Sequence, residues 1–318
     1  MKKNLIFTSF HWNPKANTAH AVAIETYLKN IFVALVSAKR NNPNDDVCLI
    51  VTEHTKNRLP DFYEGVLKQE GVSIKTVEFD SFQKKEEQAW SFSFYRLSLI
   101  KKICSEKEYS NICSIDSDTY TVSSFANIWN DARSFVLLLD LNHSPDIQQA
   151  RDQRLEASPL LNEEVSYTNY GGEFVAGSVE NLTLFVEVCE EVYQTLLQKK
   201  IHFKHGDETV LYIAAAECQN RPHITIKNAS PYVARYWTSR HFYLVSSNHK
   251  FNPVCIWHLP DEKKNGLQRL YFYYKKHRRF PTDSKCARIC GMNTHAPLRP
   301  LMMTRRMLYK ILKMDNRM

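Results

Sequence analysis

Apolar segments alternate with helix-like segments through the first 80 residues, and this order constrains the fold more than any other feature. Residues 4–10, 45–54 and 72–79 have the length and composition of strands, and residues 19–39 carry apolar side chains at helical spacing. A second helix-like stretch follows Pro60. An alternation of strands and helices predicts a mostly parallel, Rossmann-like sheet with helices on both faces, which binds its ligand at the carboxyl ends of the strands. We therefore expect an α/β fold.

The rest of the chain continues the same alternation. Its glycine content is low, with 8 glycines in 318 residues, and it contains no G-x-G-x-x-G or G-x-x-x-x-G-K motif, which argues against a glycine-rich phosphate loop. The further expected elements are helices at 92–103, 181–199 and 205–217 and strands at 111–116, 135–142, 168–178 and 251–259.

Cysteine usage and hydropathy indicate the compartment. The eight cysteines are scattered, mostly within apolar runs, which favours reduced thiols in the core of a cytosolic protein over a disulfide framework. The apolar run near the N-terminus is too short for a signal peptide, and no stretch is long enough to span a bilayer. We expect a cytoplasmic protein.

Two carboxylates end the expected strand at 111–116, within the sequence CSIDSDTYTV. Side chains at positions i and i+2 of an extended segment point to the same side, so Asp116 and Asp118 would present their oxygens together. Two like charges this close are costly unless a cation compensates them. The pair therefore favours a divalent metal site, although a D-x-D triplet is also an ordinary turn or surface sequence.

Several motifs resemble those of retaining glycosyltransferases of the GT-A fold, above all sequence family 8, which includes lipopolysaccharide galactosyl- and glucosyltransferases. The matching residues are Tyr95-Arg96-Leu97, the run from Ile115 to Val122, Ile128-Trp129, and His258-Leu259 with Lys263 and Lys264. The strand from Tyr170 to Ser178 and the run from His205 to Thr209 are similar to motifs of family 6, the blood-group-type transferases. Tyr170 and Gly206 depart from these family patterns.

This resemblance implies a GT-A catalytic domain over residues 1–268, with a nucleotide-sugar half at about 1–125 and an acceptor half at about 126–268. It implies Mn²⁺ or Mg²⁺ as the cofactor, held by Asp116, Asp118 and His258, and a nucleotide sugar as the donor. A carboxylate and imidazole set suits Mn²⁺ better than Mg²⁺. By itself, His258 beside Trp257 also fits an ordinary histidine in an aromatic cluster.

The resemblance also implies roles for further residues. Glu208 would face the anomeric carbon of the donor sugar, as nucleophile or as electrostatic support, and Asp207 would bind sugar or acceptor hydroxyls. Carboxylates in the first turn of a helix are equally explained by the helix dipole. The expected donor-binding residues are Thr8, His11, Asn13, Arg96, Ser117, Lys263 and Lys264, and the expected sugar-binding residues are Asp140, Tyr170, Gly171 and Gly172.

The basic character of the chain belongs to its C-terminal end. The formal net charge is +8, but the residues from Lys275 onward carry +10, so the rest of the chain carries −2. On a helix, residues 301–318 would place four cations opposite an apolar face, a pattern typical of binding to an anionic membrane. We expect residues 269–318 to form a basic, membrane-associating tail. Nucleic-acid binding is less favoured because the rest of the chain is slightly acidic, and packing on the catalytic domain or on a partner subunit also fits.

These observations converge on an enzyme at the inner face of the cytoplasmic membrane. The expected function is the metal-dependent transfer of a hexose from a nucleotide sugar, a UDP-sugar above all, to a lipid-linked, lipopolysaccharide or surface-polysaccharide acceptor, with retention of configuration as the resemblance implies. Two alternatives stay open. A nucleotidyltransferase also uses paired carboxylates to hold a metal on phosphates, and a non-enzymatic module would bind nucleic acid through the basic tail.

Overall fold

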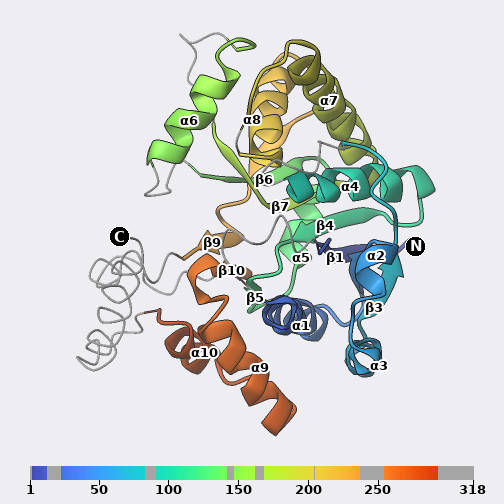
Figure 1. The fold of residues 1–318 in the computed structure, drawn as a ribbon, viewed down its shortest axis with the longest axis vertical. Coiled ribbons are helices and arrows are strands. Elements are labelled where there is room, and N and C mark those ends of the chain that lie inside the picture. The colour runs from blue at the N-terminus through green and yellow to red at the C-terminus, as the bar shows by residue number, and fades with distance from the viewer. Residues whose placement is uncertain are drawn as a thin grey trace.

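A seven-stranded sheet forms the centre of the molecule (Figure 1). The structure is a computed structural model that describes residues 2–12, 23–82, 91–141, 147–161, 168–203, 205–236 and 254–292. The strand order is β3-β2-β1-β4-β7-β6-β8, and only β7 runs antiparallel to its neighbours, which confirms the mostly parallel α/β sheet. The strands are β1 (Asn4–Phe10), β2 (Asp46–Val51), β3 (Ser73–Thr76), β4 (Asn111–Ile115), β6 (Val136–Asp140), β7 (Tyr170–Ser178) and β8 (Ile226–Asn228).

The strand order contains a switch point between β1 and β4. From β1 the chain builds outward through β2 and β3, and it then returns to place β4 on the other side of β1. In open α/β sheets the connections on the two sides of such a point diverge, which leaves a crevice at the carboxyl ends of the two strands. The residues after Phe10 and after Ile115 therefore lie where this fold class binds ligands.

Helices cover both faces of the sheet (Figure 1). One core joins α4, α7 and α8 to one face, and a second core joins α1, α3, α5 and α9 to the other. No helix among the described residues is both long and apolar enough to cross a bilayer. The helices are α1 (Ile24–Asn41), α2 (Glu53–Lys56), α3 (Asp61–Gln69), α4 (Tyr95–Glu106), α5 (Ala126–Ala132), α6 (Ile147–Ala157), α7 (Val179–Gln198), α8 (Asp207–Cys218), α9 (Gly266–His277) and α10 (Asp283–Ile289).

The alternation of side chains along β1 explains why the sheet has two cores. Leu5 and Phe7 belong to the core under α4 and α7, whereas Ile6 between them belongs to the core under α1. A strand that is buried on both faces reads as a continuous apolar run, as residues 4–10 do. The eight cysteines are all buried, as expected for core thiols.

A second sheet of three short strands lies beside the carboxyl end of β4. Its order is β5-β10-β9, with β5 (Thr119–Thr121) antiparallel to β10 (Ile256–His258) and β9 (Val233–Arg235) parallel to β10. Because β5 begins one residue after Asp118, this small sheet brings distant parts of the chain to the D-x-D turn.

The C-terminal helices α9 and α10 pack on this sheet and on α1. Tyr271 and Tyr274 of α9 contact Phe32 of α1 through edge-to-face rings, with centroids 5.2 and 5.3 Å apart. The expected domain boundary at residue 268 falls inside α9, so the first part of the basic segment is a packed helix. The helix expected at 301–318 lies outside the described residues.

Candidate functional site

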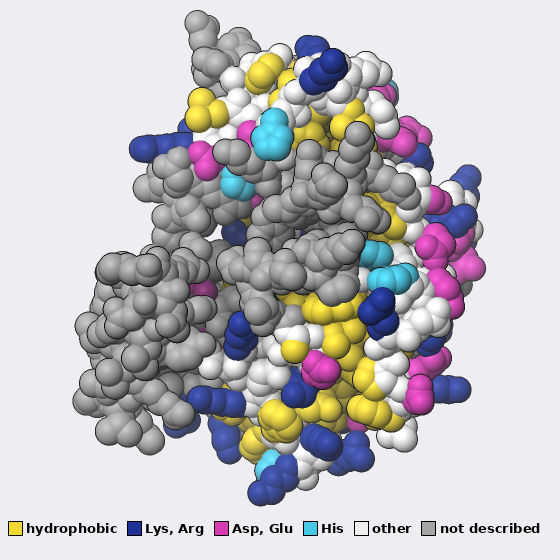
Figure 2. Space-filling model, viewed as in Figure 1, with side chains coloured by type: hydrophobic (Ala, Val, Ile, Leu, Met, Phe, Trp, Pro, Cys, Tyr) yellow, Lys and Arg dark blue, Asp and Glu magenta, His cyan; other side chains and the backbone are white. Residues whose placement is uncertain are grey.

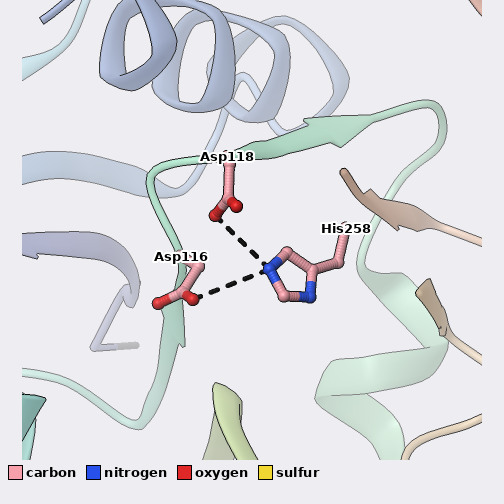
Figure 3. Close-up of side chains that lie close together, drawn as sticks. All are labelled: Asp116, Asp118 and His258. Atoms are coloured by element: carbon pink, nitrogen blue, oxygen red, sulfur yellow. Dashed lines mark ion pairs between the residues drawn. The ribbon is translucent and has the colours of Figure 1, made fainter. Parts of the chain in front are cut away.

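Asp116, Asp118 and His258 meet at the carboxyl end of β4 (Figure 3). Asp116 directly follows β4, Asp118 directly precedes β5, and His258 is the last residue of β10. The β5–β10 ladder pairs His258 with Thr119, and the backbone N–H of Leu259 donates to the carbonyl of Asp118 at 2.9 Å. The small sheet therefore carries a histidine 140 residues away in sequence to the D-x-D turn.

These three side chains, which we call the metal cluster, have the geometry and chemistry of a cation site. His258 Nε2 lies 3.3 Å from Asp118 Oδ1 and 3.7 Å from Asp116 Oδ2, and one ligand atom from each residue lies within 4.8 Å of the others. Asp118 and His258 are 1% and 3% exposed. Within the described part of the chain, neither oxygen of Asp118 accepts a well-aligned hydrogen bond. Buried carboxylate oxygens without aligned donors fit a bound divalent ion, which prefers oxygen and imidazole ligands.

Cationic side chains of the protein balance the buried aspartate. Lys263 Nζ lies 3.1 Å from Asp118 Oδ2. Burial would raise the pKa of Asp118, but Lys263 and His258 outweigh it and hold this pKa well below its usual range. Burial acts to lower the pKa of His258, and Asp118 and Glu173 reverse this and raise it to about 9. The site is therefore built to hold negative charge on Asp118 and to keep a cation beside it.

Arg96 links the metal cluster to the first turn of α8. Arg96 is a buried residue of α4, and its guanidinium forms ion pairs with Asp116 and, at 3.5 Å, with Asp207. Gly172 makes this contact possible, because a Cβ there would lie 2.7 Å from Asp207 Oδ2 and 2.9 Å from Arg96 Nη1. Burial raises the pKa of Asp207 despite the opposing effect of Arg96. The carboxylates after β4 and at the start of α8 thus share one cation.

Glu208 follows Asp207 in the first turn of α8 and is half-buried. Gln153 of α6 donates from Nε2 to Glu208 Oε2 at 3.0 Å, and Asn169 Nδ2 in turn donates to Gln153 Oε1 at 2.8 Å. Burial, followed by the charge of Glu173, raises the pKa of Glu208 to about 8. Two amide side chains in series therefore hold the carboxyl of Glu208, which changes from protonated to ionised near pH 8. The charged groups that act on it are Glu173, Arg235, Asp207 and Asp116.

The raised pKa of Glu208 predicts a specific pH dependence of stability. The folded protein keeps a proton on Glu208 up to about pH 8, whereas the unfolded chain releases it near the ordinary pKa of 4.5. The stability that Glu208 contributes is therefore lost as the pH rises from about 4.5 to about 8. Gln in its place stays neutral and still accepts from Gln153. Between about pH 5 and about pH 8 we expect the free energy of unfolding of Glu208→Gln to rise by roughly 1–3 kcal/mol relative to the native protein.

Urea denaturation across this pH range measures the effect. Glu187→Gln is the control, because Glu187 is exposed on α7 and its replacement removes one carboxyl without changing the site. A constant difference between Glu208→Gln and the native protein at every pH would show that Glu208 is ionised in the folded state, contrary to the prediction.

Two charged residues of the site were not among the residues expected from the sequence. Glu173 of β7 is 3% exposed, and its Oε1 lies 3.1 Å from Arg235 Nε and 3.3 Å from His258 Nδ1. The pKa of Glu173, raised by burial but lowered more by Arg235 and His258, is about 2. A glutamate inside the apolar run of β7 is visible in the sequence, and it could have indicated Glu173 as a residue of the site. The short strand β9 offers no comparable signal for Arg235.

The expected donor-site residues lie around the switch point. Thr8 of β1 is buried and donates from Oγ1 to the carbonyl of Ile115 at 3.1 Å, so its hydroxyl joins β1 to β4. His11 follows β1 and pairs through Nδ1 with Thr52 Oγ1 at 2.8 Å. Ser117 is half-buried in the D-x-D turn, Lys264 is exposed, and Asn13 lies outside the described residues.

The expected sugar-site residues divide into two groups. Asp140 ends β6 opposite Tyr170, the first residue of β7, and Asn228 Nδ2 donates to Asp140 Oδ2 at 3.3 Å. Gly171 and Gly172 come next on β7 and lie against the carboxylates of Glu173 and Asp207. The glycines therefore border the charged site directly.

No protein-family model matches the chain, and no curated protein matches it. The geometry of the site is therefore the basis for inferring a function.

Proposed function

We propose that the protein is a metal-dependent glycosyltransferase that moves a hexose from a nucleotide sugar, above all a UDP-sugar, to a glycan or glycolipid acceptor. The observation that carries the proposal is the metal cluster of Asp116, Asp118 and His258 at the switch point of a mostly parallel sheet. Ligands of such sheets bind at this crevice. A metal and a set of cations at this place suit a diphosphate, and the nearby carboxyls suit a sugar.

Diphosphate binding is supported by the charges around the metal cluster. A divalent ion held by Asp116, Asp118 and His258 would act as a Lewis acid on the diphosphate leaving group. Arg96 and Lys263 each pair with one of the two aspartates, so they bring positive charge to the same place. A planar guanidinium and an ammonium are the side chains that proteins use to neutralise phosphate oxygens.

Aromatic side chains after β1 support a nucleotide as the carrier of the diphosphate. The rings of Trp12 and Tyr27 lie 6.1 Å apart, and the His11 ring lies 6.2 Å from that of Tyr95 at the start of α4. Bases stack on aromatic side chains with little dependence on sequence. A nucleotide whose base is bound beside β1 would place its phosphates near the end of β4, where the metal cluster lies.

Sugar transfer is supported by the carboxyls at the start of α8. Asp207 is tied to Arg96, and Glu208 is held by Gln153. The oxocarbenium-like transition state of glycosyl transfer develops positive charge at the anomeric carbon, and a carboxylate facing that carbon stabilises it or attacks it. We assign this role to Glu208, and we propose that Asp207 binds hydroxyl groups of the sugar or of the acceptor.

A donor panel tests the proposed function. UDP-, GDP- and CMP-sugars are incubated with the protein, with and without Mn²⁺, and nucleotide release is measured. Turnover of one donor that depends on Mn²⁺ supports the proposal. Pyrophosphate release from a nucleoside triphosphate and a sugar phosphate would instead identify a nucleotidyltransferase. Failure of every donor to turn over, together with no metal-dependent donor binding in calorimetry, would overturn the proposal.

The acceptor that we propose is a lipid-linked, lipopolysaccharide or surface-polysaccharide glycan, reached through the basic C-terminal segment. Figure 2 shows Lys and Arg side chains gathered at the lower end of the molecule, where α9 lies in Figure 1. Phe272 of α9 is 54% exposed, and Lys29 Nζ lies 5.0 Å from the centroid of its ring. An exposed aromatic among cations is typical of a protein that binds to an anionic membrane. The five residues that directly follow Tyr274 are all exposed, and they are Lys275, Lys276, His277, Arg278 and Arg279.

We expect the full chain to bind liposomes that contain an anionic lipid, and to release them as salt is raised, because each cation near the surface contributes about 1 kcal/mol that salt screens. Removing residues 297–318 is expected to weaken this binding at least about tenfold. Sedimentation with liposomes measures it, and neutral liposomes are the control. Equal binding to neutral liposomes, or no binding at low salt, would contradict the prediction.

A further inference from the structure

We propose that Glu173 is a positioning residue of the metal cluster: its side chain orients His258 and its backbone holds Asp116, so that both ligands face one ion. The proposal rests on the metal site, which is part of the proposed function, and does not depend on which group the enzyme transfers. It gives β7 an indirect part in metal binding, because none of the three proposed ligands lies on that strand.

The two ring nitrogens of His258 face opposite partners. Nε2 faces the two aspartates, and Figure 3 shows the other ring nitrogen pointing away from them. That second nitrogen, Nδ1, lies 3.3 Å from Glu173 Oε1. An ionised carboxylate only accepts hydrogen bonds, so Nδ1 carries a hydrogen, and when the ring is neutral its lone pair is on Nε2. Glu173 thus selects the tautomer that binds a metal through Nε2.

The carboxylate of Glu173 is itself held in place. Arg235 Nε lies 3.1 Å from the same Oε1 that faces His258, so the carboxylate has a cationic partner on the third strand of the small sheet. On its other side, a Cβ at Gly171 would collide with Glu173 Oε2 and would lie 2.8 Å from Leu141 Cδ2. A glycine two residues earlier on β7 therefore leaves the space that this carboxylate occupies.

The backbone of Glu173 contacts a second proposed ligand. Its carbonyl accepts the backbone N–H of Asp116 at 3.1 Å, one residue beyond the last β4–β7 register pair. One residue therefore touches Asp116 through its main chain and His258 through its side chain. Arg96 pairs with one proposed ligand, Asp116, and with Asp207, and Lys263 pairs with one proposed ligand, Asp118. Neither cation forms an ion pair with two of the ligands within the described part of the chain.

A fourth metal ligand is the competing role for Glu173. The geometry favours an orienting role, because its carboxylate lies against Nδ1, whereas Nε2 on the other side of the ring faces Asp116 and Asp118. Carboxylates in this position hold the ring and raise the basicity of the metal-binding nitrogen, and their loss typically weakens metal binding by about 10–100-fold.

Mn²⁺ binding without donor or acceptor tests the proposal. Calorimetric titration of Glu173→Leu, which removes the acceptor for Nδ1, is expected to show affinity lowered by about 10–100-fold. Glu173→Gln keeps an acceptor oxygen but no charge, and we expect a smaller loss. Glu70→Gln is the matched control, because Glu70 also pairs with an arginine, Arg40, but lies outside the site. Circular dichroism establishes that each variant is folded.

A second measurement reports the tautomer directly. In protein labelled with ¹⁵N-histidine, the nitrogen shifts of His258 identify the ring nitrogen that carries the hydrogen, and the His258→Gln variant assigns the signals. At a pH above the His258 pKa of about 9, where the ring is neutral, we expect the Nδ1–H form in the native protein and a mixture of both forms in Glu173→Leu. If Glu173→Leu is folded and binds Mn²⁺ like the native protein, the orienting role is wrong. If the native protein binds no Mn²⁺, the metal site itself is wrong, which is a separate failure.

Discussion

We expect the Asp118→Asn variant to lose Mn²⁺ binding and to lower donor turnover by at least about 10³-fold. Asp118 is 1% exposed, and Lys263 and His258 outweigh the effect of burial and hold its pKa well below the usual range, so it is ionised and can ligate a metal ion. Asn has the same shape without the charge. It also leaves Lys263 and His258 beside a neutral side chain, where their mutual repulsion opposes a further cation.

Calorimetry with Mn²⁺ and nucleotide release from the donor found in the panel measure the two parts of this prediction. Asp46→Asn is the control, because Asp46 also pairs with a lysine, Lys3 at 2.9 Å, but it begins β2 and so lies at the amino ends of the parallel strands, away from the site. Retained Mn²⁺ affinity in a folded Asp118→Asn protein would exclude the metal cluster as the binding site. If Asp118→Asn loses its affinity for Mn²⁺ but turns over the donor at the native rate, the metal has a structural role and not a catalytic one.

The parallel sheet was predictable because its strands are buried on both faces. A strand that is buried on both faces, such as β1 or β4, appears in the sequence as an unbroken apolar run. The helices between the strands are recognised by apolar side chains that recur every three to four residues. The same reasoning placed Asp116 and Asp118 at a carboxyl end, since a charge directly after such a run marks where the strand leaves the core. Local patterns were sufficient for both conclusions.

The partners of the two aspartates were harder to predict because they arrive through long-range contacts. His258 reaches the site through a three-residue strand, and its expected role came from the family resemblance alone. Arg235 sits in a strand just as short, Val233–Arg235, with no apolar run to identify it. A helix or a long strand is recognised from the period at which apolar side chains recur, and a strand of three residues is too short to show such a period.

Glu173 shows a different limit. It lies within a recognisable buried strand, where a carboxylate is costly unless it is paired. The sequence therefore indicates that a partner exists but not which residue it is, because Arg235 and His258 follow 62 and 85 residues later. Charged residues inside apolar strands are a useful guide to a site even when their partners cannot be named.

Glu208→Gln is expected to lower donor turnover by about 10²–10⁴-fold while leaving Mn²⁺ affinity unchanged. Gln153 continues to find an acceptor in the new amide, so the variant changes the charge more than the shape. Glu156→Gln is the matched control: Glu156 is also a carboxyl between α6 and α8, where Thr209 donates to it at 2.6 Å. Turnover of Glu208→Gln equal to that of the native protein would show that Glu208 has no catalytic role, and Asp207 would then be the candidate carboxylate.

Azide distinguishes the two roles open to Glu208. Alanine at this position leaves space beside the anomeric carbon, so azide can attack that carbon as the nucleoside diphosphate leaves. If Glu208 is the nucleophile, azide is expected to restore nucleotide release in Glu208→Ala and to yield a glycosyl azide of configuration opposite to that of the donor. If Glu208 acts only by charge, azide restores nothing, and turnover of the Gln variant reports the loss of electrostatic stabilisation alone. The pKa of about 8 bears on both roles, because each needs the ionised carboxylate and gains from a rise in pH through that value.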